Sequence, residues 1–60
     1  MRLIKLPEVM EKTTLSRATI YRFMSEGRFP TQITLGVKSV SWIEEEIDQW
    51  IMQRLQHRKT

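Results

Sequence analysis

A chain of 60 residues that contains no cysteine has to stabilise its fold with a hydrophobic core rather than with disulfides. A domain of this size buries only about 60% of the surface that its unfolded chain exposes, so many small domains add a disulfide or a metal. The single histidine, His57, has no second ligand nearby for a zinc site. Apolar residues make up 40% of the chain, which is enough for a compact core. We therefore expect one folded domain over residues 1–60, without a metal or a cofactor.

The charge distribution favours an anionic partner. Ten Lys and Arg residues against seven Asp and Glu residues give a net charge of +3, and the basic excess lies within residues 1–38. Such a basic region is typical of proteins that bind nucleic acid. The longest apolar run has three residues, 50–52, which is too short for a membrane span or a secretion signal. We expect a protein of the cytoplasm that does not associate with a membrane.

Local signals predict two short helices in the first half of the chain. After a short edge strand over residues 2–5, Pro7 suits the first turn of a helix that extends to about residue 12. Ser16 is a good N-cap for a second helix over about residues 17–26, because its hydroxyl can accept a hydrogen bond from a free backbone N–H. Gly27 is suited to end that helix in a left-handed conformation. Two short helices separated by a turn predict a helix-turn-helix over about residues 7–27.

A β-hairpin is predicted next, over about residues 31–42. Alternating apolar residues place Ile33 and Leu35 on one face of the first strand, and Val40 and Trp42 on one face of the second. The turn between the strands covers residues 36–38. The polar residues of the hairpin are expected to point the other way: Gln32, Thr34, Ser39 and Ser41.

A third helix is predicted over about residues 42–57. Ser41 and Glu44 have the spacing of a capping box, in which each side chain bonds the backbone N–H of the other residue. Acidic residues open the helix and basic residues close it, as the helix dipole favours; the basic residues are Arg54, Arg58 and Lys59. Apolar residues recur with helical period at Ile43, Ile47, Trp50, Ile51 and Leu55.

The second predicted helix has two different sides. With Ile20 inward, Phe23 and Met24 also face the core, and the outward strip collects Arg17, Ala18, Tyr21, Arg22 and Ser25. The planar fork of an arginine can donate two hydrogen bonds to the edge of a guanine or to a phosphate. Tyr21 and the backbone amides after Ser16 can donate to phosphates, and Ala18 allows close approach of the backbone. Arg28, and Lys38 in the hairpin turn, are candidates for contacts to the flanking DNA backbone.

Several motifs of the chain are similar to those of a known family. They are LSRATIYR, EGRFP, and an LG turn that is followed by a tryptophan and by a helix with the pattern D-x-W-I. From Arg2 to about Ile51 the chain resembles the AlpA family of short phage and prophage DNA-binding regulators, which are related to excisionases and to MerR-type winged-helix domains. The resemblance implies an α+β winged helix-turn-helix fold with a basic wing residue at Lys38. It also implies a recognition helix that uses Ser16, Arg17, Thr19, Tyr21 and Arg22. Thr14 departs from the family, where glycine is more common, and a β-branched residue with positive φ is strained.

Several alternatives stay open at this point. The resemblance allows either a transcriptional regulator or an excision factor that bends attachment-site DNA for an integrase. A protein-interaction module that uses the third helix is a different class, whereas no pattern of an enzyme is present. The alternative for Arg28 and Lys38 is that they are ordinary surface charges. Thr19 is equally suited to packing between helices. Both tryptophans are expected in the core rather than stacked on bases. Because one copy is small, we expect several copies to bind DNA cooperatively side by side.

Overall fold

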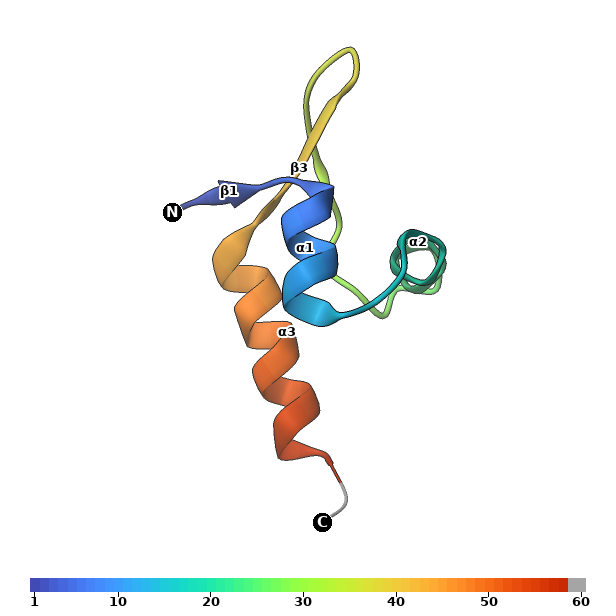
Figure 1. Ribbon diagram of the computed structural model, residues 1–60, viewed down its shortest axis with the longest axis vertical. Helices are drawn as coiled ribbons and strands as arrows, with labels where there is room; N and C mark the ends of the chain where they lie inside the picture. Colours follow the sequence, from blue (N-terminus) through green and yellow to red (C-terminus); the bar gives the residue numbers. More distant parts are fainter. Residues whose placement is uncertain (59–60) are drawn as a thin grey trace.

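The computed structural model describes residues 1–58 and shows three helices and a small antiparallel sheet (Figure 1). In chain order the elements are β1 (Leu3–Ile4), α1 (Leu6–Thr13), α2 (Arg17–Ser25), β2 (Ile33–Gly36), β3 (Ser39–Ile43) and α3 (Glu44–Gln56). This confirms the predicted α+β, winged helix-like fold, with the hairpin between the second and third helices. Lys59, one of the basic residues predicted to complement the dipole at the end of the third helix, lies outside the described residues.

The sheet joins the N-terminal strand to the hairpin. Its strand order is β1-β3-β2, and both pairs are antiparallel. Ile4 pairs with Trp42 in the first of them, and Ile33 pairs with Ser41 in the second. The central strand β3 therefore leads directly from the hairpin into α3, while the tip of the hairpin projects from one end of the molecule (Figure 1).

The prediction of which hairpin side chains share a face of the sheet is partly wrong. Residues that pair directly across two antiparallel strands share a face of the sheet. Ile33 pairs with Ser41, and Thr34 pairs with Val40, so an apolar residue lies opposite a polar one in each pair. A register irregularity between Thr34 and Gly36 interrupts the alternation, and Leu35 between them is 58% exposed.

The predicted capping box at α3 is also wrong. Ser41 is only 4% exposed within β3, and the N-cap of α3 is Ile43, without a side-chain hydrogen bond. Instead, the backbone N–H of Glu44 donates a 2.8 Å hydrogen bond to the carbonyl oxygen of Arg2. Because β3 continues to Ile43, the helix begins at Glu44, about two residues later than predicted.

The two N-terminal helices agree closely with their local signals. Pro7 lies in the first turn of α1, and the Ser16 side chain accepts a hydrogen bond from the backbone N–H of Thr19 at 3.2 Å. Gly27 follows α2 with a φ of 72°. The turn between the helices has a second left-handed residue, Thr14, with a φ of 60°. The strain expected at this β-branched residue is therefore present.

Six buried apolar side chains form the core. They come from β1, α1, α2, the segment after α2, β3 and α3, and they are Ile4, Val9, Ile20, Phe29, Trp42 and Ile47. Full burial of such a side chain stabilises the fold by about 1.5–3 kcal/mol. Trp42 is completely buried, as predicted, and its indole N–H donates to the carbonyl oxygen of Pro30 at 3.1 Å. Trp50 and Ile51 are half-buried, but Leu55 is 46% exposed, so the predicted apolar stripe of α3 leaves the core before the helix ends. No helix within residues 1–58 is both long and apolar enough to cross a membrane.

Candidate nucleic-acid interface

The second helix, α2, lies at one side of the molecule and divides into an inner and an outer side (Figure 1). Ile20 is fully buried, and Phe23 and Met24 pack against the core. The outward face of α2 consists of Arg17, Ala18, Tyr21, Arg22 and Ser25, all of them exposed except Tyr21, which is half-buried. The division predicted from helical period is therefore confirmed.

The arginine in the first turn of α2 stacks on a tyrosine of the next turn. The guanidinium carbon of Arg17 lies 5.8 Å from the ring centroid of Tyr21. A guanidinium held over a ring keeps its in-plane N–H donors available, so the ring limits its motion without using up its hydrogen bonds. This arrangement leaves the N–H donors of Arg17 available on the outward face.

The hydroxyl groups of α2 are mostly engaged within the helix. Ser16 Oγ donates to Thr19 Oγ1 at 2.9 Å, and Ser25 Oγ donates to the carbonyl oxygen of Arg22 at 2.8 Å. A phosphate oxygen only accepts hydrogen bonds, so these two serines have already used the hydrogen that a phosphate would need. The first helical amides, those of Arg17 and Ala18, have no partner inside a helix and remain suitable donors.

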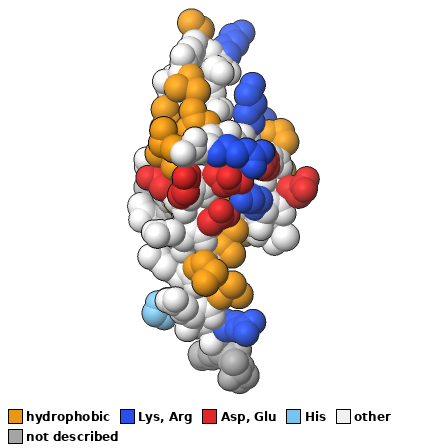
Figure 2. Space-filling view, turned by 90° about the vertical axis from the view of Figure 1, so that its left-hand side faces the viewer, with side chains coloured by type: hydrophobic (Ala, Val, Ile, Leu, Met, Phe, Trp, Pro, Cys, Tyr) orange, Lys and Arg blue, Asp and Glu red, His pale blue; other side chains and the backbone are white. Residues whose placement is uncertain are grey.

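The acidic residues gather on a different face. Figure 2 shows Asp and Glu side chains around the middle of the molecule, seen from the left-hand side of Figure 1, opposite α2. The ammonium group of Lys12 lies 2.8 Å from Asp48 and 3.0 Å from Glu44, and these hydrogen bonds raise the pKa of Lys12 above its ordinary value. Arg2 pairs with Glu44 at 3.0 Å and with Glu8 at 3.3 Å. Glu44 therefore connects α3 to α1 and to the residue before β1, rather than only complementing the helix dipole.

The next acidic residue, Glu45, has a pKa below its ordinary value. The main cause is a hydrogen bond from its own backbone N–H at the start of α3, and the backbone N–H of Arg2 adds to it. The terminal ammonium group of Met1 lies 3.6 Å from the Glu45 carboxylate. Glu45 is thus held in its charged form by the amide donors and the terminal ammonium group around it.

The arginines on the outward face have no such partners. Among residues 1–58, no carboxylate lies within salt-bridge distance of Arg17 or Arg22. Since four acids of α1 and α3 pair with cations on another face, the outward face of α2 keeps its positive charge; these acids are Glu8, Glu44, Glu45 and Asp48. This agrees with the partition of charge expected from the sequence.

The two basic residues predicted outside α2 occupy different places. Arg28 lies beside α2, with its guanidinium carbon 5.1 Å from the ring centroid of Phe23 and a nitrogen 3.3 Å from Glu26. Lys38 is exposed next to Val37 in the turn of the hairpin, which Figure 1 shows well away from α2. The structure therefore brings Arg28, but not Lys38, next to the outward face.

Sequence reasoning missed one basic residue of this region. Arg54 was interpreted only as a complement to the dipole of α3, but its guanidinium carbon lies 4.7 Å from the Trp50 ring and 5.9 Å from the Phe23 ring. The spacing of four residues between Trp50 and Arg54 was a usable signal, because such residues are neighbours on a helix surface. In the described part of the chain, no group of three or more metal-ligating side chains is present.

Two helices joined by a turn, with exposed arginines on the second and a hairpin after it, define a small protein of helix-turn-helix type. Residues 2–55 match the family described as prophage CP4-57 regulatory protein (AlpA). The chain is 48% identical over 59 residues to the "DNA-binding transcriptional activator AlpA" of Escherichia coli (strain K12), which covers 88% of this chain and 84% of that protein. It is 43% identical over 58 residues to the "Uncharacterized protein ORF88" of Enterobacteria phage P4, which covers 97% of this chain and 66% of that protein. The chain belongs to the AlpA family of prophage regulatory proteins.

Proposed function

We propose that this protein binds specific double-stranded DNA and regulates transcription on a prophage. The observation that carries the proposal is the charge of α2: Arg17 and Arg22 are exposed on one face and, within residues 1–58, have no carboxylate partner. The name of the E. coli relative, a DNA-binding transcriptional activator, supports the same function. The protein acts without catalysis, in the bacterial cytoplasm, on DNA of the nucleoid.

In the proposed complex, α2 enters the major groove with its outward face toward the bases. Arg17 and Arg22 donate to guanine edges or to phosphates, and Ala18 allows the helix to approach closely. Tyr21 and the first amides of α2 contact the phosphate backbone. The proposed interface comprises Ser16, Arg17, Ala18, Thr19, Tyr21, Arg22, Ser25, Arg28 and Lys38. Ser16 and Ser25 take part in it as hydrogen-bond acceptors, because their hydroxyl hydrogens bond within the chain.

The hairpin carries the second proposed contact. Lys38 lies in the exposed turn of a hairpin that projects from the body of the protein, so it meets the duplex away from the groove that α2 occupies. A lysine is a flexible point charge, which suits a phosphate better than a particular base. Lys38 therefore adds affinity for any sequence rather than preference for one.

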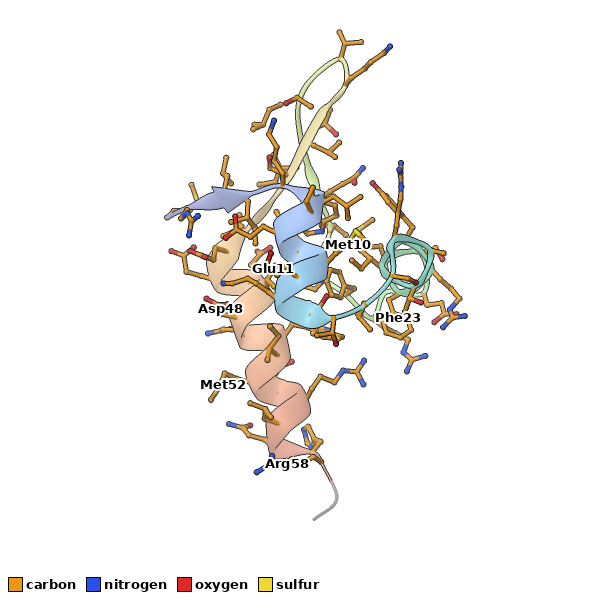
Figure 3. The ribbon with its side chains drawn as sticks, viewed as in Figure 1. Met10, Glu11, Phe23, Asp48, Met52 and Arg58 are labelled. Atoms are coloured by element: carbon orange, nitrogen blue, oxygen red, sulfur yellow. The ribbon has the colours of Figure 1, made fainter. Side chains whose placement is uncertain are left out.

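Several copies of the protein bind neighbouring sites in this proposal. A single small module covers only about 600–1,000 Å² of its own surface on DNA, so useful occupancy needs cooperation. The exposed apolar side chains Met52 and Leu55, on the C-terminal half of α3, support contact between copies. Figure 3 places Met52 on the side of α3 that faces away from α2, where it is free while α2 occupies DNA.

Selection of bound duplexes from a random-sequence pool tests the proposed function. The wild-type protein is expected to enrich one short motif, and a variant with Arg17→Ala and Arg22→Ala serves as the control that loses it. Motifs that map to a prophage promoter support the regulator. Motifs that map to an attachment site instead assign the protein to excision, with an integrase as partner. If the wild-type protein enriches no motif, the proposed function is wrong.

A further inference from the structure

Three arginines from three different parts of the chain converge on one aromatic ring. The guanidinium carbons of Arg22, Arg28 and Arg54 lie 5.5, 5.1 and 5.9 Å from the ring centroid of Phe23. Arg22 belongs to α2, Arg28 to the segment that follows it, and Arg54 to α3. We call this group the arginine–aromatic cluster, and its members are Arg22, Phe23, Arg28, Trp50 and Arg54.

The aromatic part of the cluster is held by the core. The indole N–H of Trp50 donates a 2.8 Å hydrogen bond to the carbonyl oxygen of Arg28, and the Trp50 ring meets the buried ring of Phe29 edge to face at 4.9 Å. Arg54 stacks over Trp50 at 4.7 Å. The arginines thus lie beside a platform that the fold positions, and a guanidinium next to a ring keeps its planar donors available for another acceptor.

The charges of the cluster are not balanced by the protein. Glu26 lies 3.3 Å from Arg28, but within residues 1–58 no carboxylate is within salt-bridge distance of Arg22 or Arg54. Three positive charges that each lie within 6 Å of one ring centroid repel each other, so an anion that binds among them relieves an unfavourable interaction. A charge-assisted hydrogen bond from arginine to phosphate is among the strongest that such an anion can form.

An open depression lies beside the cluster, between the segment after α2 and the outer side of α3. Its volume is about 670 Å³, and Arg28, Thr31, Trp50 and Arg54 contribute to its wall, together with one acid, Glu46. The depression is wide and open to solvent, which suits a group carried on a larger molecule. Because two arginines and one acid line the depression, its net charge is positive.

We propose that the arginine–aromatic cluster binds a phosphate of the DNA backbone, and that Arg54 extends the DNA-contacting surface from α2 onto α3. This inference rests on the proposed function. Arg22 belongs both to the outward face of α2 and to the cluster, so a duplex that seats α2 in its groove brings its own backbone to the cluster. The ligand is therefore a phosphodiester of the bound duplex rather than a free anion.

The test compares Arg54 of α3 with Arg58, which lies two residues beyond the end of that helix. Arg54→Ala removes the cluster contact, and Arg58→Ala removes a charge that Figure 3 shows at a distance from Phe23. Binding to a short duplex of mixed sequence is measured over a series of KCl concentrations. Because phosphate contacts do not depend on sequence, such a duplex reports them. Circular dichroism and thermal unfolding check that both variants fold as the wild type does.

Arg54→Ala is expected to weaken binding about ten-fold at low salt and to lower the slope of log K against log salt by about one unit. Arg54→Lys keeps the charge and is expected to keep the slope. Equal effects of Arg54→Ala and Arg58→Ala, while the wild type binds DNA, would overturn the inference and leave the proposed function intact. A wild type that binds no duplex would overturn both.

A titration with inorganic phosphate, monitored by tryptophan fluorescence, is expected to show no saturation. A saturable response that is lost in Arg54→Ala, while this variant binds DNA as the wild type does, would assign the cluster to a free anion instead.

Discussion

The indole N–H of Trp50 in α3 donates a 2.8 Å hydrogen bond to the carbonyl oxygen of Arg28, which lies two residues after the C-cap of α2. Together with the edge-to-face contact between Trp50 and Phe29, this bond ties the end of α2 to the long C-terminal helix. The helix that bears the candidate DNA contacts is therefore positioned by α3 as well as by the turn that precedes it.

Replacing this tryptophan tests that connection. Trp50→Phe removes the N–H donor but keeps an aromatic ring, so the free energy of unfolding is expected to fall by about 1 kcal/mol. The matched variant Trp42→Phe removes the hydrogen bond to Pro30 in a fully buried position and is expected to cost more, about 2–3 kcal/mol. Urea unfolding measures both. An unchanged midpoint for Trp50→Phe would show that the bond does not hold α3 to the end of α2.

The left-handed residue between α1 and α2 offers a stabilising substitution. Thr14 has a φ of 60°, which glycine adopts without the steric cost of a branched side chain. Thr14→Gly is expected to raise the free energy of unfolding by about 0.5–1 kcal/mol, after the greater entropy of an unfolded glycine is included.

Gly27→Ala is the reciprocal control for this backbone effect. A Cβ at Gly27 meets no atom within 4 Å, so the loss of stability, about 1 kcal/mol, comes from the φ of 72° alone. Thermal unfolding of both variants tests the argument. A destabilised Thr14→Gly protein would mean that the Thr14 side chain contributes more than its backbone strain costs.

The ion pairs of Lys12 predict a pH dependence of stability. The pKa of Lys12 is raised in the folded protein by hydrogen bonds from its ammonium group to Asp48 and Glu44. A raised pKa contributes stability that is fully present below the pKa of the unfolded chain and is lost as the pH rises through the folded value. Lys12→Met is therefore expected to unfold at a lower temperature than the wild type at neutral pH.

The difference between the two proteins is expected to shrink at strongly alkaline pH and at high salt. Thermal unfolding across a pH series measures it, and Lys5→Met, which changes an exposed lysine of the same region, controls for the loss of one positive charge. A difference that stays constant into alkaline pH would contradict the assigned ion pairs.

The turn of the hairpin makes a separate prediction for DNA binding. Lys38→Ala is expected to weaken binding to all duplexes alike and to lower the salt slope by about one unit, because its proposed contact is to phosphate. Val37→Ala, which changes the fully exposed neighbour without changing charge, is the control. Competition between duplexes that differ by one base pair distinguishes the outcomes. A changed base preference in Lys38→Ala would place this lysine on a base edge instead.

Features set by neighbours in the sequence were predictable here. The bounds of α2 follow from Ser16 and Gly27, whose capping and left-handed roles depend only on the adjacent backbone. The inner and outer sides of that helix follow from its period once Ile20 is taken as buried. The candidate contacts on α2 were therefore placed correctly on one face before any tertiary contact was known, although their role in DNA binding stays a prediction.

Features set by partners far along the chain were not predictable. Ser41 has the sequence signature of a cap, but pairing with Ile33 holds it inside β3, and the carbonyl oxygen of Arg2 bonds the first amide of α3 instead. Arg54 gains its candidate role only because Phe23, 31 positions earlier, lies beside it in the fold. The spacing of Trp50 and Arg54 could indicate the contact between these two side chains, but the pairing of Ser41 and the approach of Phe23 to Arg54 depend on how the elements pack.

The outward face of α2 is proposed to read the DNA sequence, and a footprint on one selected site tests this proposal most directly. Protection of that site is compared for the wild type and for the protein with Arg17→Ala and Arg22→Ala, after both are shown to be equally folded. Each substitution is expected to cost about 1–3 kcal/mol of binding free energy and to relax base preference, so the double variant should lose protection at concentrations where the wild type is saturated. Protection of the same bases at equal affinity by the double variant would contradict the account.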